Sequence, residues 1–268
     1  MTLPASIRKL LPHDPTPLGG GLDNTVYTSG NLIVRIANNP NPDALRREAA
    51  LLTAIADLPV ATPVPVAVDD DAGILVYHRL PGTPLLHRPR TAATLGPSLG
   101  KLLSALHSAP IPPTTRTDDT PLTDWLTDTA DTYPAAAPAL TPTQRRAVEH
   151  FLATPPPAPA SPPVLTHSDL GAEHLLIDPD TGALTGIIDW TDATITHRAV
   201  DFGRLYRDLG PTTHSEVLAH YSPEWTEADE HLTRFFARCT LIEDLAYGLT
   251  TARHTYLSAA LANFSHTF

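Results

Sequence analysis

Between residues 164 and 190, two histidines and two aspartates are set apart by segments rich in apolar or small residues that indicate strands of a core. His167, Asp169 and His174 lie in a polar loop after a short predicted strand, and Asp189 follows two more predicted strands. A buried polar side chain is costly unless it is hydrogen-bonded or has a function. An ordinary hydrogen-bonded turn would explain any one of these residues. Four at one site indicate a functional cluster.

The N-terminal part of the chain has the pattern of short β-strands. The sequence predicts a glycine-rich turn at residue 18, then a hairpin of strands 25–28 and 32–37 with a tight turn at Ser29–Gly30. A helix is predicted next, at residues 41–57, because an N-cap residue and a proline precede apolar residues at helical spacing. We therefore expect a flexible hairpin followed by a single helix.

Two more strands are predicted at 64–69 and 73–80, after which the sequence LPGTP at 80–84 breaks the pattern. From residue 91 onward the pattern is helical. The predicted helices lie at 98–108, 122–132, 142–153, 199–209, 213–221 and 226–253. We expect an α+β protein with one lobe at residues 1–80 and a helical lobe at residues 81–268.

The charge of the chain narrows the set of partners. Its 268 residues include 18 lysines and arginines and 29 aspartates and glutamates, which gives a formal net charge of −11 at pH 7. This excess disfavours nucleic acid and anionic membranes as partners and is compatible with a cationic ligand. The single cysteine, Cys239, excludes an internal disulfide and a cysteine metal cluster. Because the sequence has no signal peptide and no apolar run of about 20 residues, we expect a cytoplasmic protein.

Two kinds of chemistry fit the polar cluster. In a metal hydrolase, all four residues would bind a transition metal, although their spacing matches no specific signature. In phosphoryl transfer, one aspartate accepts the proton of the attacking hydroxyl, a group five residues later holds a metal ion, and a later aspartate completes a Mg²⁺ site that bridges the phosphates. Asp169, His174 and Asp189 have these offsets. Phosphoryl transfer therefore explains more of the pattern.

The segments HSDLGAEHLLID (167–178) and GIIDW (186–190) resemble the catalytic loop and the metal-binding aspartate of the aminoglycoside phosphotransferase superfamily. The resemblance implies a bilobal protein-kinase-like fold, with a small antiparallel sheet and one helix in the N-terminal lobe and a larger helical C-terminal lobe. It also implies that Asp169 is the catalytic residue and that His174 and Asp189 are ligands of Mg²⁺.

The chain departs from the usual family motif at two positions. Ser168 stands where the family has glycine, and His174 stands where it has asparagine, which resembles the macrolide phosphotransferase branch. The sequence AVDFG also resembles a family segment, in which Asp201 is expected to cap the catalytic loop. The family has an acidic residue and a proline just before that segment, whereas this chain has His197 and Arg198.

The resemblance implies a site for ATP or GTP in the N-terminal lobe. The hairpin Gly19–Tyr27 resembles the loop that covers the nucleotide phosphates, because glycines let backbone N–H groups approach an anion. Arg35 stands where kinases have their phosphate-binding lysine, and Glu48 is placed to pair with it. The strand GILVYHRL resembles the hinge that binds the purine edge, with Tyr77 close to the base. The residues expected to bind nucleotide are Gly21, Asn24, Thr25, Arg35, Glu48, Tyr77, His78 and Leu80.

The function that the resemblance implies is an O-phosphotransferase, dependent on ATP or GTP and Mg²⁺, that modifies a small hydroxylated antibiotic and so gives resistance. An aminoglycoside, a macrolide and a basic peptide fit equally well. Six carboxylates expected on the acceptor side suit a cationic acceptor: Glu173, Asp192, Asp208, Glu216, Glu243 and Asp244. Two alternatives stay open, a metabolic kinase for choline, homoserine, a methylthio-sugar or a glycated amine, and a pseudokinase that binds without turnover. The modified hydroxyl, the preferred nucleotide and the oligomeric state also stay open.

Overall fold

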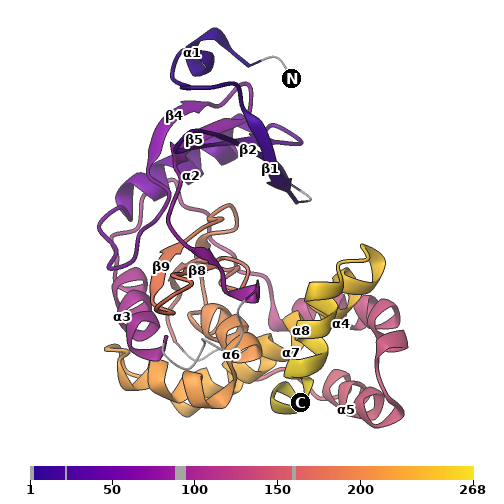
Figure 1. Ribbon diagram of the computed structural model, residues 1–268. Coiled ribbons are helices and arrows are strands. Elements are labelled where there is room, and N and C mark those ends of the chain that lie inside the picture. The colour runs from indigo at the N-terminus through magenta and orange to yellow at the C-terminus, as the bar shows by residue number, and fades with distance from the viewer. Residues whose placement is uncertain (1–2, 22, 88–94, 159–160) are drawn as a thin grey trace.

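A five-stranded antiparallel sheet forms the N-terminal part of the protein (Figure 1). The computed structural model describes residues 3–21, 23–87, 95–158 and 161–268. The strand order is β1-β2-β3-β5-β4. The strands are β1 (Thr16–Gly20), β2 (Asn24–Ser29), β3 (Leu32–Ala37), β4 (Pro65–Asp69) and β5 (Ile74–His78). A short helix, α1 (Ala5–Arg8), precedes the sheet, and α2 (Pro42–Ala54) packs against β4 and β5.

Local sequence signals explain the hairpin and the start of α2. Gly30 has a φ of 58° in the turn between β2 and β3, a conformation that glycine adopts without strain. The Asn41 side chain accepts the N–H of Ala44 at 3.1 Å, and Pro42 occupies the first helical position. The expected hairpin turn and N-cap are therefore confirmed.

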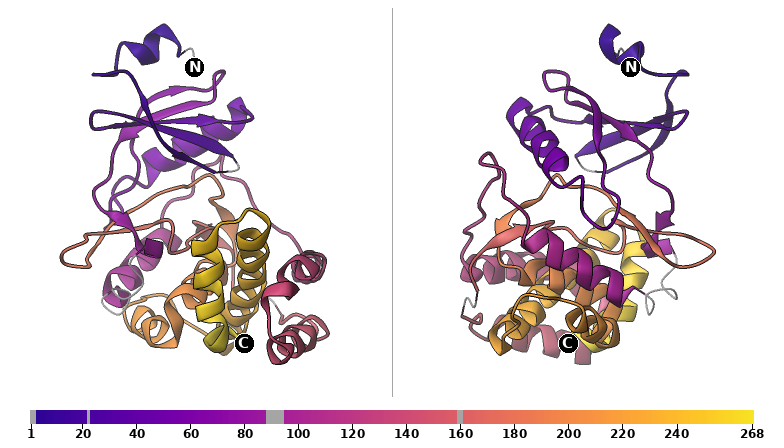
Figure 2. Two further views of the ribbon diagram at one scale, coloured as in Figure 1. Left: turned by 45° about the vertical axis from the view of Figure 1, so that its right-hand side comes forward. Right: turned by 90° about the vertical axis from the view of Figure 1, so that its left-hand side faces the viewer.

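The C-terminal part is mainly helical, and its helices lie below the sheet in all three ribbon views (Figures 1 and 2). The long helices α6, α7 and α8 pack on one another, and α3 and α4 pack on α6 and α7 respectively. The helical elements are η1 (Leu85–His87), α3 (Gly96–His107), α4 (Leu122–Ala136), η3 (Ala137–Ala139), α5 (Pro142–Leu152), α6 (Ala199–Ala219), α7 (Glu227–Thr250) and α8 (His254–Thr267).

Two small antiparallel sheets carry the polar loop between the large sheet and the helices. The first pairs β7 (Val164–Thr166) with β10 (Thr194–Thr196). The second has the order β6-β8-β9, with β6 (Thr83–Pro84), β8 (Leu175–Ile177) and β9 (Leu184–Ile187). The strands that the sequence predicted around the polar loop are thus present. The residues between β7 and β8 and those after β9 are held at both ends by paired backbone.

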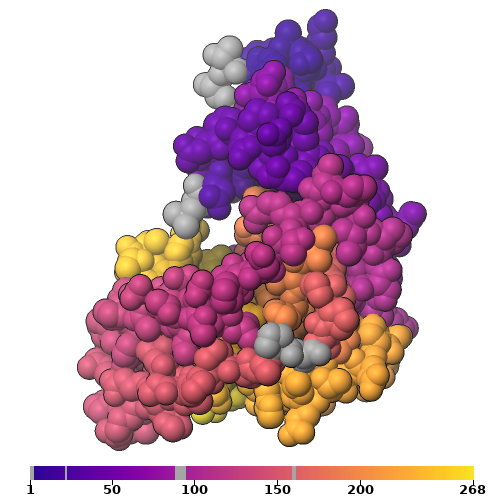
Figure 3. Space-filling model, turned by 180° about the vertical axis from the view of Figure 1, so that it is seen from behind, coloured from indigo at the N-terminus to yellow at the C-terminus, as the bar shows by residue number. Residues whose placement is uncertain are grey.

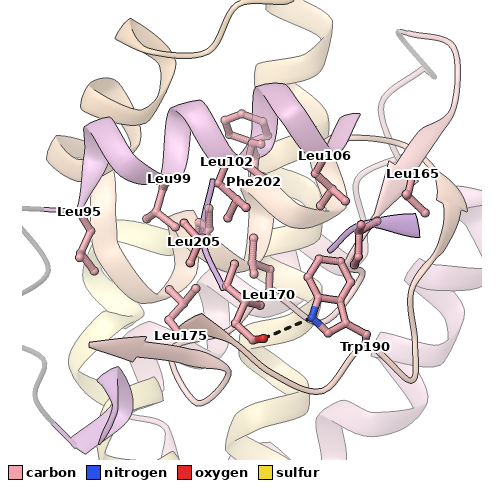
Figure 4. Packing of buried hydrophobic residues seen from close by; sticks show 14 of the residues in the cluster. Leu95, Leu99, Leu102, Leu106, Leu165, Leu170, Leu175, Trp190, Phe202 and Leu205 are labelled. Carbon is pink, nitrogen blue, oxygen red and sulfur yellow. Dashed lines mark hydrogen bonds between the residues drawn. The ribbon is translucent and has the colours of Figure 1, made fainter. Parts of the chain in front are cut away.

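The largest buried cluster joins α3 to these small strands (Figure 4). Leu102 and Leu106 lie one turn apart on α3, and neither is exposed. Trp190 is 1% exposed in the same cluster, and its Nε1 donates to the Ile187 carbonyl at 3.3 Å. Burial of so large a side chain fixes the backbone next to it. The position of Asp189 therefore depends on the core.

Two segments differ from the sequence prediction. The glycine-rich segment that we expected as a turn forms the end of strand β1, which pairs with β2, and the turn begins only at Gly21. The helices expected at 199–209 and 213–221 form the single element α6, which is broken at Gly210, where φ is 75°, just before Pro211. Proline cannot donate a helical hydrogen bond, so the gap that the sequence predicted between the two helices is confirmed as a break within α6.

The end of the chain forms a helical hairpin that the sequence pattern did not predict. We expected one helix at 226–253, but α7 ends at Thr250 and α8 follows a turn in which Ala252 has a φ of 55°. The two helices approach closely at Gly248, where an added Cβ would lie 2.7 Å from the Leu257 nitrogen. The stability of α8 comes from this packing, which a local sequence pattern does not reveal.

The architecture is the expected α+β fold, with a small antiparallel sheet above a larger helical part. The boundary that we placed after residue 80 stays a prediction. In the part of the chain that the structure describes, no helix combines the length and the apolar character needed to cross a membrane.

Candidate active site

Asp201, in the first turn of α6, holds the start of the polar loop. Its Oδ2 accepts the N–H of His167 at 3.1 Å, and its Oδ1 accepts the N–H of Ser168 at 2.9 Å. Ser168 has a φ of 67°, in the left-handed region that favours glycine. His107 Nε2 lies 3.1 Å from Asp201 Oδ2 and helps to orient this carboxylate. The expectation that Asp201 caps the loop is therefore confirmed.

His167 links the polar loop to the strand end that precedes Asp189. Its side chain is fully buried, and burial lowers its pKa, which favours the neutral imidazole. Nδ1 accepts the N–H of Asp169 at 3.3 Å, so that Nε2 carries the proton and donates to the Ile188 carbonyl at 3.1 Å. One neutral imidazole thus fixes the distance between the segments that carry Asp169 and Asp189.

Asp169 lies in the loop with 26% of its side chain exposed. Its Oδ1 is 2.9 Å from Arg204 Nη1, and its Oδ2 is 3.4 Å from His174 Nδ1. Burial raises the pKa of Asp169, but the positive charges of Arg204 and His174 lower it by more, to about 2. At neutral pH the carboxylate is ionised and able to accept a proton.

His174 and Asp189 present a nitrogen and an oxygen to one another. His174 Nδ1 donates to the Asp169 main-chain carbonyl at 2.7 Å, and Nε2 lies 3.8 Å from Asp189 Oδ2. In the neutral form of the imidazole, the proton is on Nδ1 and Nε2 has its lone pair on the side of Asp189. Ligand atoms of Asp169, Glu173 and His174 also lie within 4.8 Å of one another. This set of oxygens with one imidazole fits a divalent cation such as Mg²⁺.

Arg35 connects the large sheet to the segment that carries Asp189. Its guanidinium forms a buried ion pair with Glu48, as the sequence predicted. Its Nη1 donates to Thr191 Oγ1 at 3.1 Å and lies 3.7 Å from Asp189 Oδ1. Thr191 in turn donates to Asp189 Oδ1 at 2.9 Å. The position of the guanidinium therefore depends on α2, and the position of Asp189 depends in part on Arg35.

A cavity of about 580 Å³ lies between the large sheet and the polar loop. Seen from behind, the surface is notched between the N-terminal sheet and the end of the chain (Figure 3). The volume is in the range of sites for small molecules and cofactors. Seven of the predicted site residues line this cavity: Gly21, Asn24, Arg35, Tyr77, Leu80, His174 and Asp189.

Four of the predicted site residues do not line the cavity. Glu48 lies behind Arg35, and Asp169 lies beside His174. The Thr25 hydroxyl donates to Asn38 Oδ1 at 2.9 Å, and the His78 side chain is exposed. Direct contact of the Thr25 and His78 side chains with a ligand in this cavity is therefore not supported, and the nucleotide-binding role of the whole set stays a prediction.

The backbone of His78 makes no ladder hydrogen bond to β3, and its role in a hinge stays a prediction. His78 is opposite Leu32 in the β3–β5 register, and the next residue, Arg79, donates its N–H to the Asn31 carbonyl at 2.9 Å. Hydrogen-bonded and non-hydrogen-bonded pairs alternate in an antiparallel ladder. The N–H and C=O of His78 consequently point away from β3.

Sequence reasoning missed several residues at the site. Arg79 and Tyr256 line the cavity, and Arg204 contacts Asp169. Tyr256 comes from α8, which was not predicted, so nothing in its local sequence pointed to the site. Arg204 lies three residues after the expected cap Asp201, on the next turn of α6, and this helical spacing was a usable signal.

Most of the expected acceptor-side carboxylates gather around two arginines on α6, of which one is buried and one is half-buried. Arg207 is 1% exposed, and its Nε and Nη2 contact Asp208 at 2.7 and 2.8 Å. Its Nη1 lies 3.1 Å from Asp244, and its Nη2 lies 4.0 Å from Glu173. The second arginine is Arg204, beside Asp169. The arginines therefore neutralise part of this acidic surface.

The acceptor-side carboxylates outnumber the two arginines, and three of them have raised pKa values. Burial raises the pKa of Asp244, Glu243 and Asp192, and in each case neighbouring carboxylates raise it further against the opposing charge of the arginines. Glu216 is the exception, because it packs against Gly96 of α3. The expectation that Glu216 belongs to the acceptor side is wrong.

Several solved structures have the same fold. Aminoglycoside phosphotransferase APH(2")-IIia, in complex with GDP and kanamycin, matches with a TM-score of 0.73 and 20% identity over 95% of this chain and 93% of that chain. Macrolide 2'-phosphotransferase type I matches with a TM-score of 0.62 and 20% identity over 98% of each chain. Macrolide 2'-phosphotransferase MphH from Brachybacterium faecium matches with a TM-score of 0.60 and 20% identity, over 97% of this chain and 96% of that chain. These matches confirm the expected protein-kinase-like fold.

Sequence comparison supports the same assignment. The uncharacterized protein YcbJ of Bacillus subtilis (strain 168) is 30% identical over 101 residues, which are 36% of this chain and 32% of that protein. The chain thus matches about a third of the length of this curated relative. The model of a family described as the phosphotransferase enzyme family matches residues 14–234, most of the chain. On this match the chain belongs to the phosphotransferase enzyme family.

Proposed function

We propose that this chain is an O-phosphotransferase that transfers the γ-phosphoryl group of ATP or GTP to a hydroxyl of a small cationic antibiotic and so confers resistance. The observation that carries the proposal is that His174, Asp189 and Arg35 line one cavity, with Asp169 directly beside His174. The structures with this fold that were solved with GDP and kanamycin, and those of macrolide phosphotransferases, support an antibiotic as the acceptor.

The residues divide the work of the transfer between them. Arg35 binds the phosphates of the nucleotide, and Glu48 holds its guanidinium in place. Asp169 orients the acceptor hydroxyl and takes its proton. The acceptor oxygen then forms a bond to the γ-phosphorus, the bond from that phosphorus to the bridging oxygen breaks, and the nucleoside diphosphate leaves. The glycine-rich turn at Gly21 covers the phosphates, and the strand end at Tyr77 holds the base.

His174 and Asp189 are the residues that would hold Mg²⁺, which neutralises charge on the phosphates and orients them. When the His174 imidazole is neutral, Nε2 has the free lone pair, and Asp189 supplies the anionic oxygen. Asp189 has a φ of 62°, so its backbone is held in an uncommon conformation beside the buried Trp190. Such a position is typical of a functional site whose surroundings fix the backbone.

A cationic acceptor fits the charge of the surface beside Asp169. Five carboxylates, those of Glu173, Asp192, Asp208, Glu243 and Asp244, lie near two arginines, Arg204 and Arg207, so acidic groups outnumber basic groups there. An ammonium group of the acceptor would be stabilised here. The net charge of −11 also makes nucleic acid and anionic membranes unsuitable partners, and the expected site of action is the cytoplasm.

A panel of acceptors tests this function. Release of nucleoside diphosphate is measured with ATP and with GTP in Mg²⁺, with aminoglycosides, macrolides, basic peptide antibiotics, choline, homoserine, methylthioribose and glycated amines as acceptors. Turnover with an antibiotic is the expected result. Turnover with a metabolite alone would identify a metabolic kinase, and nucleotide binding without any turnover would identify a pseudokinase.

Asp169→Asn tests the assignment of the base. A positioned base contributes about 10² to 10⁴ to the rate, so we expect kcat to fall by at least about 10²-fold while the Kd of the nucleotide stays within a factor of about two. The kcat comes from diphosphate release, and the Kd comes from calorimetry. Asp180→Asn, in the exposed turn between β8 and β9, is the matched control. Turnover of Asp169→Asn at the wild-type rate would contradict the assignment.

A further inference from the structure

Arg204 of α6 contacts the catalytic loop at two consecutive residues. Its Nε donates to the Ser168 carbonyl at 2.7 Å, and its Nη1 lies 2.9 Å from Asp169 Oδ1. Only 15% of the Arg204 side chain is exposed, so the guanidinium has little freedom to leave this position. In the part of the chain that the structure describes, no other arginine or lysine forms an ion pair with Asp169.

The structure assigns to Arg204 the role of a positioning residue that holds Oδ1 of Asp169 and leaves Oδ2 as the oxygen that receives the proton of the acceptor hydroxyl. This inference rests on the proposed function, because that function requires a base and the inference says which oxygen of the base takes the proton. It goes beyond the proposed function because it distinguishes the two carboxylate oxygens and brings α6 into the chemistry.

The backbone around Asp169 is already fixed by other groups. The N–H of Ser168 donates a hydrogen bond to Asp201, and the main-chain carbonyl of Asp169 accepts a hydrogen bond from His174 Nδ1 at 2.7 Å. These hydrogen bonds do not restrict the rotation of the Asp169 side chain. Arg204 removes this freedom, because the guanidinium fork binds the Ser168 carbonyl and Oδ1 at the same time.

The two oxygens of the carboxylate have different surroundings. Oδ1 is engaged by Arg204, whereas Oδ2 accepts no hydrogen bond from any residue that the structure describes. The neighbour of Oδ2 is His174 Nδ1 at 3.4 Å, and the proton of this nitrogen is directed to the Asp169 main-chain carbonyl. Oδ2 therefore has free lone pairs. A base held in one orientation is effective because errors of about 1 Å cost rate.

The inference is tested with a double-mutant cycle on Arg204 and Asp169, using the best acceptor of the panel. Arg204→Gln is expected to lower kcat by about 10-fold or more, with the Kd of Mg²⁺–nucleotide within a factor of about two. In the Asp169→Asn background the same substitution is expected to change kcat by less than about three-fold, because the base through which Arg204 acts is already absent. Equal losses in both backgrounds, or no loss in Arg204→Gln alone, would overturn the inference.

Two further variants keep the result interpretable. Arg204→Lys keeps a positive charge for Oδ1 but lacks the fork that also reaches the Ser168 carbonyl, so its kcat is expected between those of wild type and Arg204→Gln. If Arg204→Gln does not fold, Arg204→Lys replaces it in the cycle, with the same additivity criterion. Arg234→Gln, an α7 arginine paired with Glu230, controls for loss of a guanidinium and is expected to leave kcat unchanged. The proposed function fails if no antibiotic of the panel is turned over. If Asp169→Asn keeps full turnover, the assignment of Asp169 as the base fails, whereas a loss in Asp169→Asn without one in Arg204→Gln refutes only the role of Arg204.

Discussion

At position 174 an imidazole stands where the usual family motif has an amide. Burial lowers the pKa of His174, but the charges of Asp169, Glu173 and Asp189 raise it by more. The imidazole must be neutral to bind a metal, so metal affinity is expected to fall as the pH drops through this raised pKa, which lies above the usual 6.5. Imidazole also suits Mn²⁺ and Co²⁺ better than an amide oxygen does.

The role of His174 is tested by calorimetry of Mg²⁺ and Mn²⁺ with nucleotide between about pH 5.5 and 8. His174→Asn is expected to keep binding and to lose the acid-side decrease in affinity. His174→Ala is expected to raise the Mg²⁺ concentration for half-maximal binding by about 10-fold or more. His150→Ala on the exposed face of α5 is the control. An alanine variant with unchanged metal and pH dependence would show that Asp189 holds the metal with other partners.

Tyr77 is the other residue whose substitution gives a specific expectation. It lines the cavity at the end of β5, and burial raises its pKa to about 12, so the hydroxyl is neutral. A bulky ring beside the base crowds the inner end of the pocket and is expected to favour GTP. Tyr77→Ala should therefore shift the ratio of kcat/KM for GTP and ATP toward ATP, and Tyr77→Phe, which keeps the ring, should not. Equal kcat/KM for both nucleotides, with a ratio unchanged in Tyr77→Ala, would refute this role.

At the scale of elements, the N-terminus of α7 is tied to the N-terminus of α6 by a buried ion pair. Asp229 accepts the N–H of Thr226 at 2.9 Å in a capping box, and its carboxylate is bound by Arg198 at 3.0 and 2.6 Å. Arg198 thus holds the two helix starts together, which gives a structural reason for an arginine at a position where the family has a different residue. Burial raises the pKa of Asp229, but the hydrogen bonds from Arg198 and Thr226 lower it by more, to about 2.

This ion pair predicts a pH dependence of stability. The folded-state pKa of Asp229, about 2, is below the ordinary 3.8, so the stabilisation is complete above about pH 4 and is lost as the pH falls toward 2. It amounts to about 2 kcal/mol of unfolding free energy. Urea unfolding between pH 2 and 7 is expected to show a shallower acid-side loss for Asp229→Asn, with a lower stability at pH 7 because Arg198 loses its partner. Glu227→Gln, exposed in the same turn, is expected to match wild type.

At the scale of the whole molecule, contacts between distant parts of the sequence hold the sheet over the helical part. Arg35 of β3 donates to Thr191 Oγ1 at 3.1 Å, and Arg253, between α7 and α8, donates to the Gly20 carbonyl at 3.2 Å. The cavity is lined from both sides of this junction. A nucleotide bound in it would therefore stabilise both parts together.

Thermal unfolding measures this coupling. Mg²⁺ with a non-hydrolysable nucleotide at about 100 times its Kd should add about 2.7 kcal/mol of stability. For a chain of this size that corresponds to a rise in Tm of about 5 to 10 °C in a single transition. Asp189→Ala is expected to lose most of the Mg²⁺-dependent rise, because the anionic metal ligand is gone, whereas Asp180→Ala should keep it. A full rise in Asp189→Ala would exclude Asp189 as the main ligand.

The sequence by itself determined the elements whose signals are local. The turn at Gly30 and the cap at Asn41 follow from the backbone and hydrogen-bonding properties of single residues. The spacing of Asp169, His174 and Asp189 was sufficient to favour phosphoryl transfer over a metal hydrolase as the prediction. Each of these signals is contained within a short stretch of chain, so no knowledge of the packing was needed.

Only the tertiary structure decided which distant side chains meet. The approach of Arg204 to Asp169 and the contact of Arg35 with Thr191 join residues on different elements, and α8 exists because it packs on α7. The left-handed backbone of Ser168, at a position where the family has glycine, likewise depends on tertiary structure. The hydrogen bond from its N–H to Asp201 holds the loop in this conformation. Such contacts depend on how helices and strands pack in space, and a local sequence pattern carries no record of which neighbour a side chain will face.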